Sequence, residues 1–90
     1  MIYDSKIGKI DLKKVIRLYP AVVIIAEGEE VHMSLEWAEI NSDKISIESY
    51  VLVFDFTPHG EKIRDKKEIR FDTKDELFLA MQEVAQFFQN

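Results

Sequence analysis

Hydrophobic and polar residues alternate with a period of two over much of the chain, and this pattern predicts β-strands. A run rich in β-branched residues, Val15 to Ala26, predicts a long strand that ends in a turn around Gly28. Pro20 lies inside this run. Because proline has no N–H to donate to a sheet ladder, we expect an edge or a bulge there. The next segment, Glu30 to Ile40, predicts a strand with one buried and one wet face. Asn41 to Lys44 is rich in turn-forming residues and predicts a hairpin into the following strand.

The strand predicted from Ile45 to Thr57 changes its buried face partway along. Ile47 lies in one phase, whereas Leu52 and Phe54 lie in the other. Since side chains alternate strictly along a strand, this change requires an inserted residue (a β-bulge) or a passage in which both faces are covered. A straight strand of this length would span roughly 43 Å, and a compact chain of this size has a radius of gyration of roughly 12 Å. We therefore predict a sharp bend near residues 49 and 50.

The end of the chain predicts a short strand followed by a helix. A long loop over about residues 57–66 precedes the strand Glu68 to Asp72, whose Ile69 and Phe71 are expected to face inward. Thr73 and the glutamate three residues later fit a capping box at the start of a helix. The helix is expected to pack on the core, because apolar residues recur at helical spacing at Leu77, Met81, Val84 and Phe88.

Residues 1–14 allow two structures. Asp11 is suited to cap a short helix, and Ile7 to Leu12 is suited to form a leading strand. The whole pattern predicts one α+β domain over residues 1–90. We expect a strongly bent antiparallel β-meander of about four to five strands, partly closed, with one C-terminal α-helix packed on it.

Composition and charge narrow the function classes. Ninety residues without cysteine exclude disulfides and thiolate metal sites. A net charge of −5 argues against DNA or other nucleic-acid partners, which are bound by neutralising phosphates. The longest apolar run, Tyr19 to Ala26, is far shorter than the roughly 20 residues that cross a bilayer. The first residues also lack the apolar stretch of a signal peptide, so we expect a cytoplasmic protein without a membrane span.

The sequence shows no motif typical of a catalytic, metal-binding or phosphate-binding site. His32 and His59 are the only histidines, and no thiol accompanies them. Gly8, Gly28 and Gly60 are isolated and match no phosphate-binding loop, and no G-x-S-x-G elbow is present. No motif identifies a family. We therefore expect no metal, no cofactor and no catalytic role.

One basic segment is a candidate binding site. Five basic residues lie within nine positions, with Asp65 and Glu68 interleaved for a local charge of +3, namely Lys62, Arg64, Lys66, Lys67 and Arg70. Such a loop is suited to an anionic partner: an acidic protein, a lipid headgroup or RNA. RNA is the weakest of these, because base stacking needs exposed aromatic side chains and Phe54, Phe56 and Phe71 are expected inside.

Self-association is the other candidate. The centres of two strands, Leu18 to Ile25 and Tyr50 to Phe56, are apolar on both faces, and Leu79 lies on the polar side of the helix. Either the sheet curls enough to bury both faces, or a partner chain covers one of them. We therefore expect a small non-catalytic protein-interaction module that binds a protein partner or itself as a homodimer. The alternative is a binder of an anionic ligand through residues 62–70.

Overall fold

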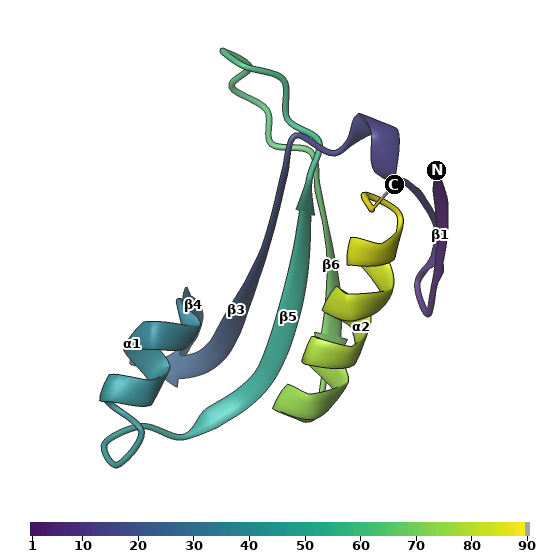
Figure 1. Ribbon diagram of the computed structural model, residues 1–90. Coiled ribbons are helices and arrows are strands. Elements are labelled where there is room, and N and C mark those ends of the chain that lie inside the picture. Colours follow the sequence, from purple (N-terminus) through teal and green to yellow (C-terminus); the bar gives the residue numbers. More distant parts are fainter. Residues whose placement is uncertain (90) are drawn as a thin grey trace.

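The computed structural model describes residues 1–89 and contains six strands and two α-helices (Figure 1). In chain order the elements are β1 (Ile2–Ser5), β2 (Gly8–Asp11), the 3-10 helix η1 (Leu12–Lys14), β3 (Arg17–Ala26), β4 (Glu29–Met33), α1 (Leu35–Ile40), β5 (Ile47–Asp55), β6 (Lys66–Phe71) and α2 (Lys74–Gln86). β1 and β2 form a two-stranded antiparallel sheet, and the remaining strands form a four-stranded antiparallel sheet in the order β4-β3-β5-β6. The predicted α+β class with a C-terminal helix is confirmed, and the sheet is open rather than partly closed.

One face of the four-stranded sheet packs against α2 and the β1–β2 hairpin. Leu52 and Phe54 of β5 face this side and join Ile69 of β6 and Leu77 of α2 in one buried cluster. Phe54 is fully buried, and its ring stacks on Tyr3 of β1 with the ring centroids 6.4 Å apart. The prediction that the apolar second half of β5 lies beneath the terminal helix is confirmed.

The phase change in β5 is a β-bulge. Val23 of β3 pairs with Ser49 and the next residue pairs with Ile47, so Glu48 has no partner in the register. This single inserted residue places Ile45 on the same side as Tyr50, where both pack in the cluster below α1. Figure 1 shows β5 curving at this end, as the predicted bend near residues 49 and 50 requires.

Pro20 lies on a part of β3 that has one neighbouring strand. β4 pairs with β3 only from Val22 to Ala26, whereas β5 pairs along the length of β3 from Arg17 onward. The other side of β3 around Pro20 is therefore a sheet edge. This confirms one of the two placements expected for a proline within a strand.

The strand predicted over Glu30–Ile40 is wrong beyond Met33. Ser34 is a helix N-cap, and its Oγ accepts a hydrogen bond of 3.1 Å from the N–H of Trp37. α1 follows, because an apolar pair at Leu35 and Ala38 also fits a helix face. The hairpin predicted at residues 41–44 is wrong as well, because this turn connects α1 to β5, and β3 lies between β4 and β5.

Both structures left open for residues 1–14 occur. β2 ends at Asp11, within the expected leading strand, and Asp11 then caps η1 by accepting a hydrogen bond of 3.1 Å from the N–H of Lys13. β1, which pairs with β2, was not predicted. Within residues 1–89, every helix is too short or too polar to cross a bilayer.

The second face of the four-stranded sheet is buried by long polar side chains. The inner strands carry small residues on this face, and four of them are buried, namely Ala21, Val23, Val51 and Val53. From the outer strand β6, Arg70 reaches across to β4 and donates hydrogen bonds of 3.0 and 2.7 Å to Glu30. The pKa of the Glu30 carboxyl is lowered, mainly because of these hydrogen bonds from Arg70. His32 and Glu68 meet across the same two strands at 3.9 Å.

The second face is buried within a single chain, as one of the two explanations for the doubly apolar strands requires, but the sheet is open and does not bury this face by curling. The small side chains of the second face are buried within a single chain, because long side chains from the outer strands extend over them. A partner chain is therefore not needed to cover this face.

Candidate functional site

Antiparallel pairing gathers basic residues at one end of the sheet. The start of β3, the end of β5 and the start of β6 are adjacent, since Arg17 pairs with Asp55 and Asp55 pairs with Lys66. η1 directly precedes β3, which brings its lysines to the same place. Eight of the twelve lysines and arginines lie at this basic end: Lys9, Lys13, Lys14, Arg17, Lys62, Arg64, Lys66 and Lys67. Five acidic residues accompany them: Asp4, Asp11, Asp55, Glu61 and Asp65.

The opposite end of the molecule is acidic. The β3–β4 turn, α1, the turn that follows it and the bulge lie at the other end of β3 (Figure 1). This acidic end contains Glu27, Glu29, Glu36, Glu39, Asp43 and Glu48, with Lys44 as the basic residue in the turn. The longest dimension of the molecule is 40 Å, so the two charged regions are well separated.

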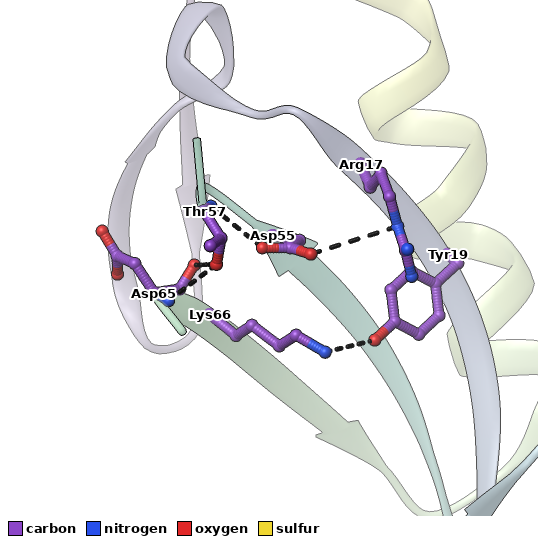
Figure 2. Close-up of polar contacts among 6 residues, drawn as sticks. All are labelled: Arg17, Tyr19, Asp55, Thr57, Asp65 and Lys66. Atoms are coloured by element: carbon purple, nitrogen blue, oxygen red, sulfur yellow. Dashed lines mark hydrogen bonds and ion pairs between the residues drawn. The ribbon is translucent and has the colours of Figure 1, made fainter. Parts of the chain in front are cut away.

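Hydrogen bonds hold the base of the loop between β5 and β6, residues 56–65 (Figure 2). The buried carboxylate of Asp55 accepts a hydrogen bond of 2.9 Å from the N–H of Thr57. The Thr57 hydroxyl in turn accepts one of 2.8 Å from the N–H of Asp65, on the other side of the loop. Arg17 Nε lies 4.0 Å from Asp55 Oδ2, and Lys66 Nζ donates to the hydroxyl of Tyr19 at 3.0 Å. The loop is therefore anchored where it leaves and re-enters the sheet.

The same contacts keep Asp55 charged. The hydrogen bonds from the backbone and side chain of Thr57 lower the pKa of this carboxyl, and the charges of Lys66 and Arg17 lower it further. A buried carboxylate with these partners anchors the loop as a fixed negative charge.

The structure separates the five basic residues that the sequence grouped. Lys62 and Arg64 lie on the loop, while Lys66 and Lys67 point to opposite faces of β6 because side chains alternate along a strand. Lys66 contacts Tyr19, and Lys67 Nζ lies 5.8 Å from the centre of the Phe56 ring. Arg70 lies further along β6 and is paired with Glu30. Lys62, Arg64, Lys66 and Lys67 therefore remain at the basic end, where residues of β2, η1 and the start of β3 join them, and Arg70 does not.

A hollow of about 360 Å³ lies within the basic end. It is lined by three lysines, two aspartates and one aromatic ring, namely Lys9, Lys14, Lys67, Asp11, Asp65 and Phe56. Lysines from separate elements converge here on one concave surface, which is the kind of arrangement that binds a small anion.

An apolar groove of about 420 Å³ runs between α2 and β3. The residues that line it carry no charge, and they are Leu18, Tyr19, Pro20, Leu52, Met81, Ala85, Phe88 and Gln89. Leu18 is exposed although it is apolar, and so is Phe88, with 53% of its surface accessible. The prediction that Phe88 belongs to the core stripe of the helix is wrong, because α2 ends at Gln86. The groove adjoins the edge of β3 that has no second neighbouring strand.

Leu79 lies on the other flank of α2. It is 60% exposed and lines a separate hollow of about 270 Å³ together with Tyr3, Lys6 and Glu83. The Tyr3 hydroxyl donates to Glu83 Oε1 at 3.4 Å. Burial raises the pKa of this tyrosine, and the nearby Glu83 carboxylate adds to the effect.

The two histidines are far from forming a metal site. His32 lies on β4 beside Glu68, and His59 lies in the loop between β5 and β6. Across residues 1–89 there is no group of three or more histidine, aspartate or glutamate side chains that could hold a metal ion.

The fold and these surfaces define a small α+β protein with an open antiparallel sheet, one apolar groove and one basic end. Searches against protein-family models, curated proteins and solved structures found no match to this chain.

Proposed function

We propose that this protein is a small, non-catalytic, cytoplasmic interaction module whose apolar groove binds a second copy of the chain. The observation that carries the proposal is the groove itself: an uncharged hollow of about 420 Å³ with exposed Leu18 and Phe88 at its rim. Exposed apolar residues around a concave surface are typical of protein-binding sites.

Charge favours a second copy as the occupant. Two molecules that each carry a net charge of −5 repel one another, and contact costs least where the surface is uncharged. The groove meets this condition because its lining is apolar or neutral. Pro20 cannot donate a ladder hydrogen bond, which disfavours the addition of a strand at this edge. The contact is therefore expected through side chains, with Phe88 as an aromatic anchor.

Replacing Phe88 with glutamate is expected to weaken dimerisation at least about tenfold, which corresponds to roughly 1.4 kcal/mol. The change places a charge in an apolar interface, and twofold symmetry places a second one nearby. Light scattering coupled to size-exclusion chromatography at two concentrations measures the effect. Wild type is expected to shift towards the mass of a dimer at the higher concentration, and the F88E variant to stay monomeric.

Leu79→Glu is the matched control, because Leu79 is equally apolar and exposed but lies on the other flank of α2. This variant is expected to dimerise as wild type does. A wild-type protein that is strictly monomeric at both concentrations would remove the proposal, as would an F88E variant with unchanged dimerisation.

A second candidate function is the binding of an anionic ligand at the basic end. The observation in its favour is that the fold places Lys13, Lys14 and Arg17 beside the basic residues of the segment 62–67. Retention on a heparin column tests it. The triple variant Arg64→Gln, Lys66→Gln, Lys67→Gln is expected to elute at clearly lower salt than wild type, because fewer phosphate- or sulfate-binding charges remain.

The matched control for this candidate changes the net charge equally at three lysines outside the basic end, namely Lys6, Lys44 and Lys74. Its elution is expected to stay close to that of wild type. If wild type shows no salt-sensitive retention, the anionic-ligand function is wrong.

A further inference from the structure

The loop between β5 and β6 exposes an isoleucine at a projecting position. Ile63 is 84% exposed, the highest fraction among the large hydrophobic side chains that the structure describes. Lys62 and Arg64 flank it in the chain. Figure 1 shows this loop extending beyond the end of the sheet, away from both helices. Ile63 is therefore an exposed apolar side chain between two cations, with Glu61 and Asp65 as the next residues along the loop.

We propose that this loop docks on an anionic lipid bilayer. Ile63 enters the boundary between headgroups and acyl chains, and Lys62 and Arg64 bind the negatively charged headgroups. This inference rests on the second proposed function, the binding of an anionic ligand at the basic end, and names the ligand as a lipid surface.

The shape of the loop favours a bilayer over a folded protein. Ile63 is 84% exposed and is not among the residues that line the hollows at the basic end, which are the concave surfaces that would receive a side chain from a partner. Protein interfaces concentrate their energy in such packed pockets. A fluid lipid surface instead accepts a convex, projecting side chain.

The composition of the loop argues against RNA. Phe56, at the start of the loop, is partly buried against the core, and residues 57–65 contain no phenylalanine, tyrosine or tryptophan. Recognition of single-stranded RNA normally uses such rings for base stacking. An isoleucine cannot replace them, whereas it is well suited to a hydrocarbon boundary.

The charge distribution sets the orientation on the membrane. At the basic end eight basic residues outnumber the five acidic ones, although the whole chain is negative. The acidic end lies towards the far side of a molecule 40 Å long. Because the Debye length is about 8 Å at physiological salt, repulsion between the acidic end and the lipid is screened. The basic end therefore faces the bilayer.

The anchored base makes the loop an attachment point for the whole molecule. Thr57 joins the two sides of the loop through Asp55 and the backbone of Asp65 (Figure 2). A loop fixed at its base loses less conformational freedom on binding than a free segment does. Its tip can therefore hold the sheet in one orientation on the lipid.

Co-sedimentation with vesicles tests the proposal. Wild type is expected to bind vesicles of phosphatidylcholine and phosphatidylserine, mixed at roughly 7:3, and not vesicles of phosphatidylcholine alone. Binding is expected to fall as salt rises. Ile63→Ser is expected to lower the partition coefficient about tenfold, because the transfer of this apolar side chain is lost. The double variant Lys62→Gln, Arg64→Gln is expected to abolish binding at physiological salt.

Ile40→Ser is the matched control. Ile40 is 79% exposed, close to the value for Ile63, but lies on α1 at the acidic end. Its vesicle binding is expected to equal that of wild type. A similar loss in both serine variants would show a general effect of surface hydrophobicity and overturn the proposal.

Two further outcomes overturn the inference. One is equal binding of the I63S variant and wild type, which would leave no role for insertion. The other is retention of wild type on heparin without binding to mixed vesicles, which would remove the lipid surface while the anionic-ligand function stands. A wild-type protein that binds neither heparin nor the mixed vesicles would show that the anionic-ligand function is wrong as well.

Discussion

Replacing Phe54 with alanine is expected to lower the free energy of unfolding by about 3–5 kcal/mol. Phe54 is fully buried, stacks on Tyr3 and faces α2 across the main core. Removing the ring leaves a cavity among the sheet, the helix and the N-terminal hairpin, which cannot collapse together without moving all three. Since domains of this size are stable by only about 5–15 kcal/mol, the loss is a large share of the total. Urea denaturation followed by circular dichroism measures it.

Phe78→Ala is the control for this prediction. Phe78 has the same side chain but lies on the exposed side of α2. Its replacement is expected to change stability by less than about 1 kcal/mol. Equal losses in the two variants would contradict the placement of Phe54 at the centre of the core.

Deleting Val53 is expected to abolish cooperative folding, whereas deleting Glu48 is expected to preserve it. Glu48 is the extra residue of the bulge, so without it Ile47 can still pair with Ile24 of β3. Deletion of Val53 instead shifts the preceding part of β5 by one position. Leu52 and Tyr50 would then leave the helix-covered core, and each large buried side chain is worth about 1.5–3 kcal/mol.

Thermal unfolding followed by circular dichroism separates these two deletions. A sharp transition is expected for the variant without Glu48, with a moderate decrease in its midpoint, and none for the variant without Val53. If both deletions abolish the transition, the bulge is not the simple one-residue insertion that the register indicates.

Local signals in the sequence identified several elements correctly. Thr73 begins α2 as predicted, and its hydroxyl accepts a hydrogen bond of 3.2 Å from the N–H of Glu76. The phase change between Ile47 and Leu52 required either a bulge or a passage with both faces covered, and the register contains a bulge. Ile69 and Phe71 of β6 face inward as the alternation indicated. Each of these features depends on residues that are close together in the chain.

The error over residues 30–40 has a specific cause. A period of two continues through Val31, Met33 and Leu35, and these side chains do share one cluster. The backbone nevertheless changes from strand to helix, because Ser34 caps the first turn of α1 and Ala38 continues the helical face. The few apolar positions at this boundary fit both the two-residue period of a strand and the 3.6-residue period of a helix. Ser34, an N-cap residue at that point, was the signal that could have separated them.

The two proposed binding surfaces could not be derived from local patterns. The basic end forms because β3, β5 and β6 are neighbours, which places η1 beside a loop that lies far away in the chain. The apolar groove depends on where α2 ends and on how far β4 extends along β3. Both surfaces follow from strand order, and strand order is set by contacts that are distant in sequence.

By itself the sequence determined the fold class, the C-terminal helix, the change of buried face along β5 and the uneven distribution of charge along the chain. Alternation, capping and turn chemistry act between residues a few positions apart, so they can be read directly along the chain. Only the tertiary structure decided that Arg70 and Glu30 meet above the small side chains of the second face. It also decided that Ile63 is exposed on a loop that extends from the basic end. The reason is that these arrangements depend on which strands pair and how the sheet twists, and a linear pattern does not contain that information.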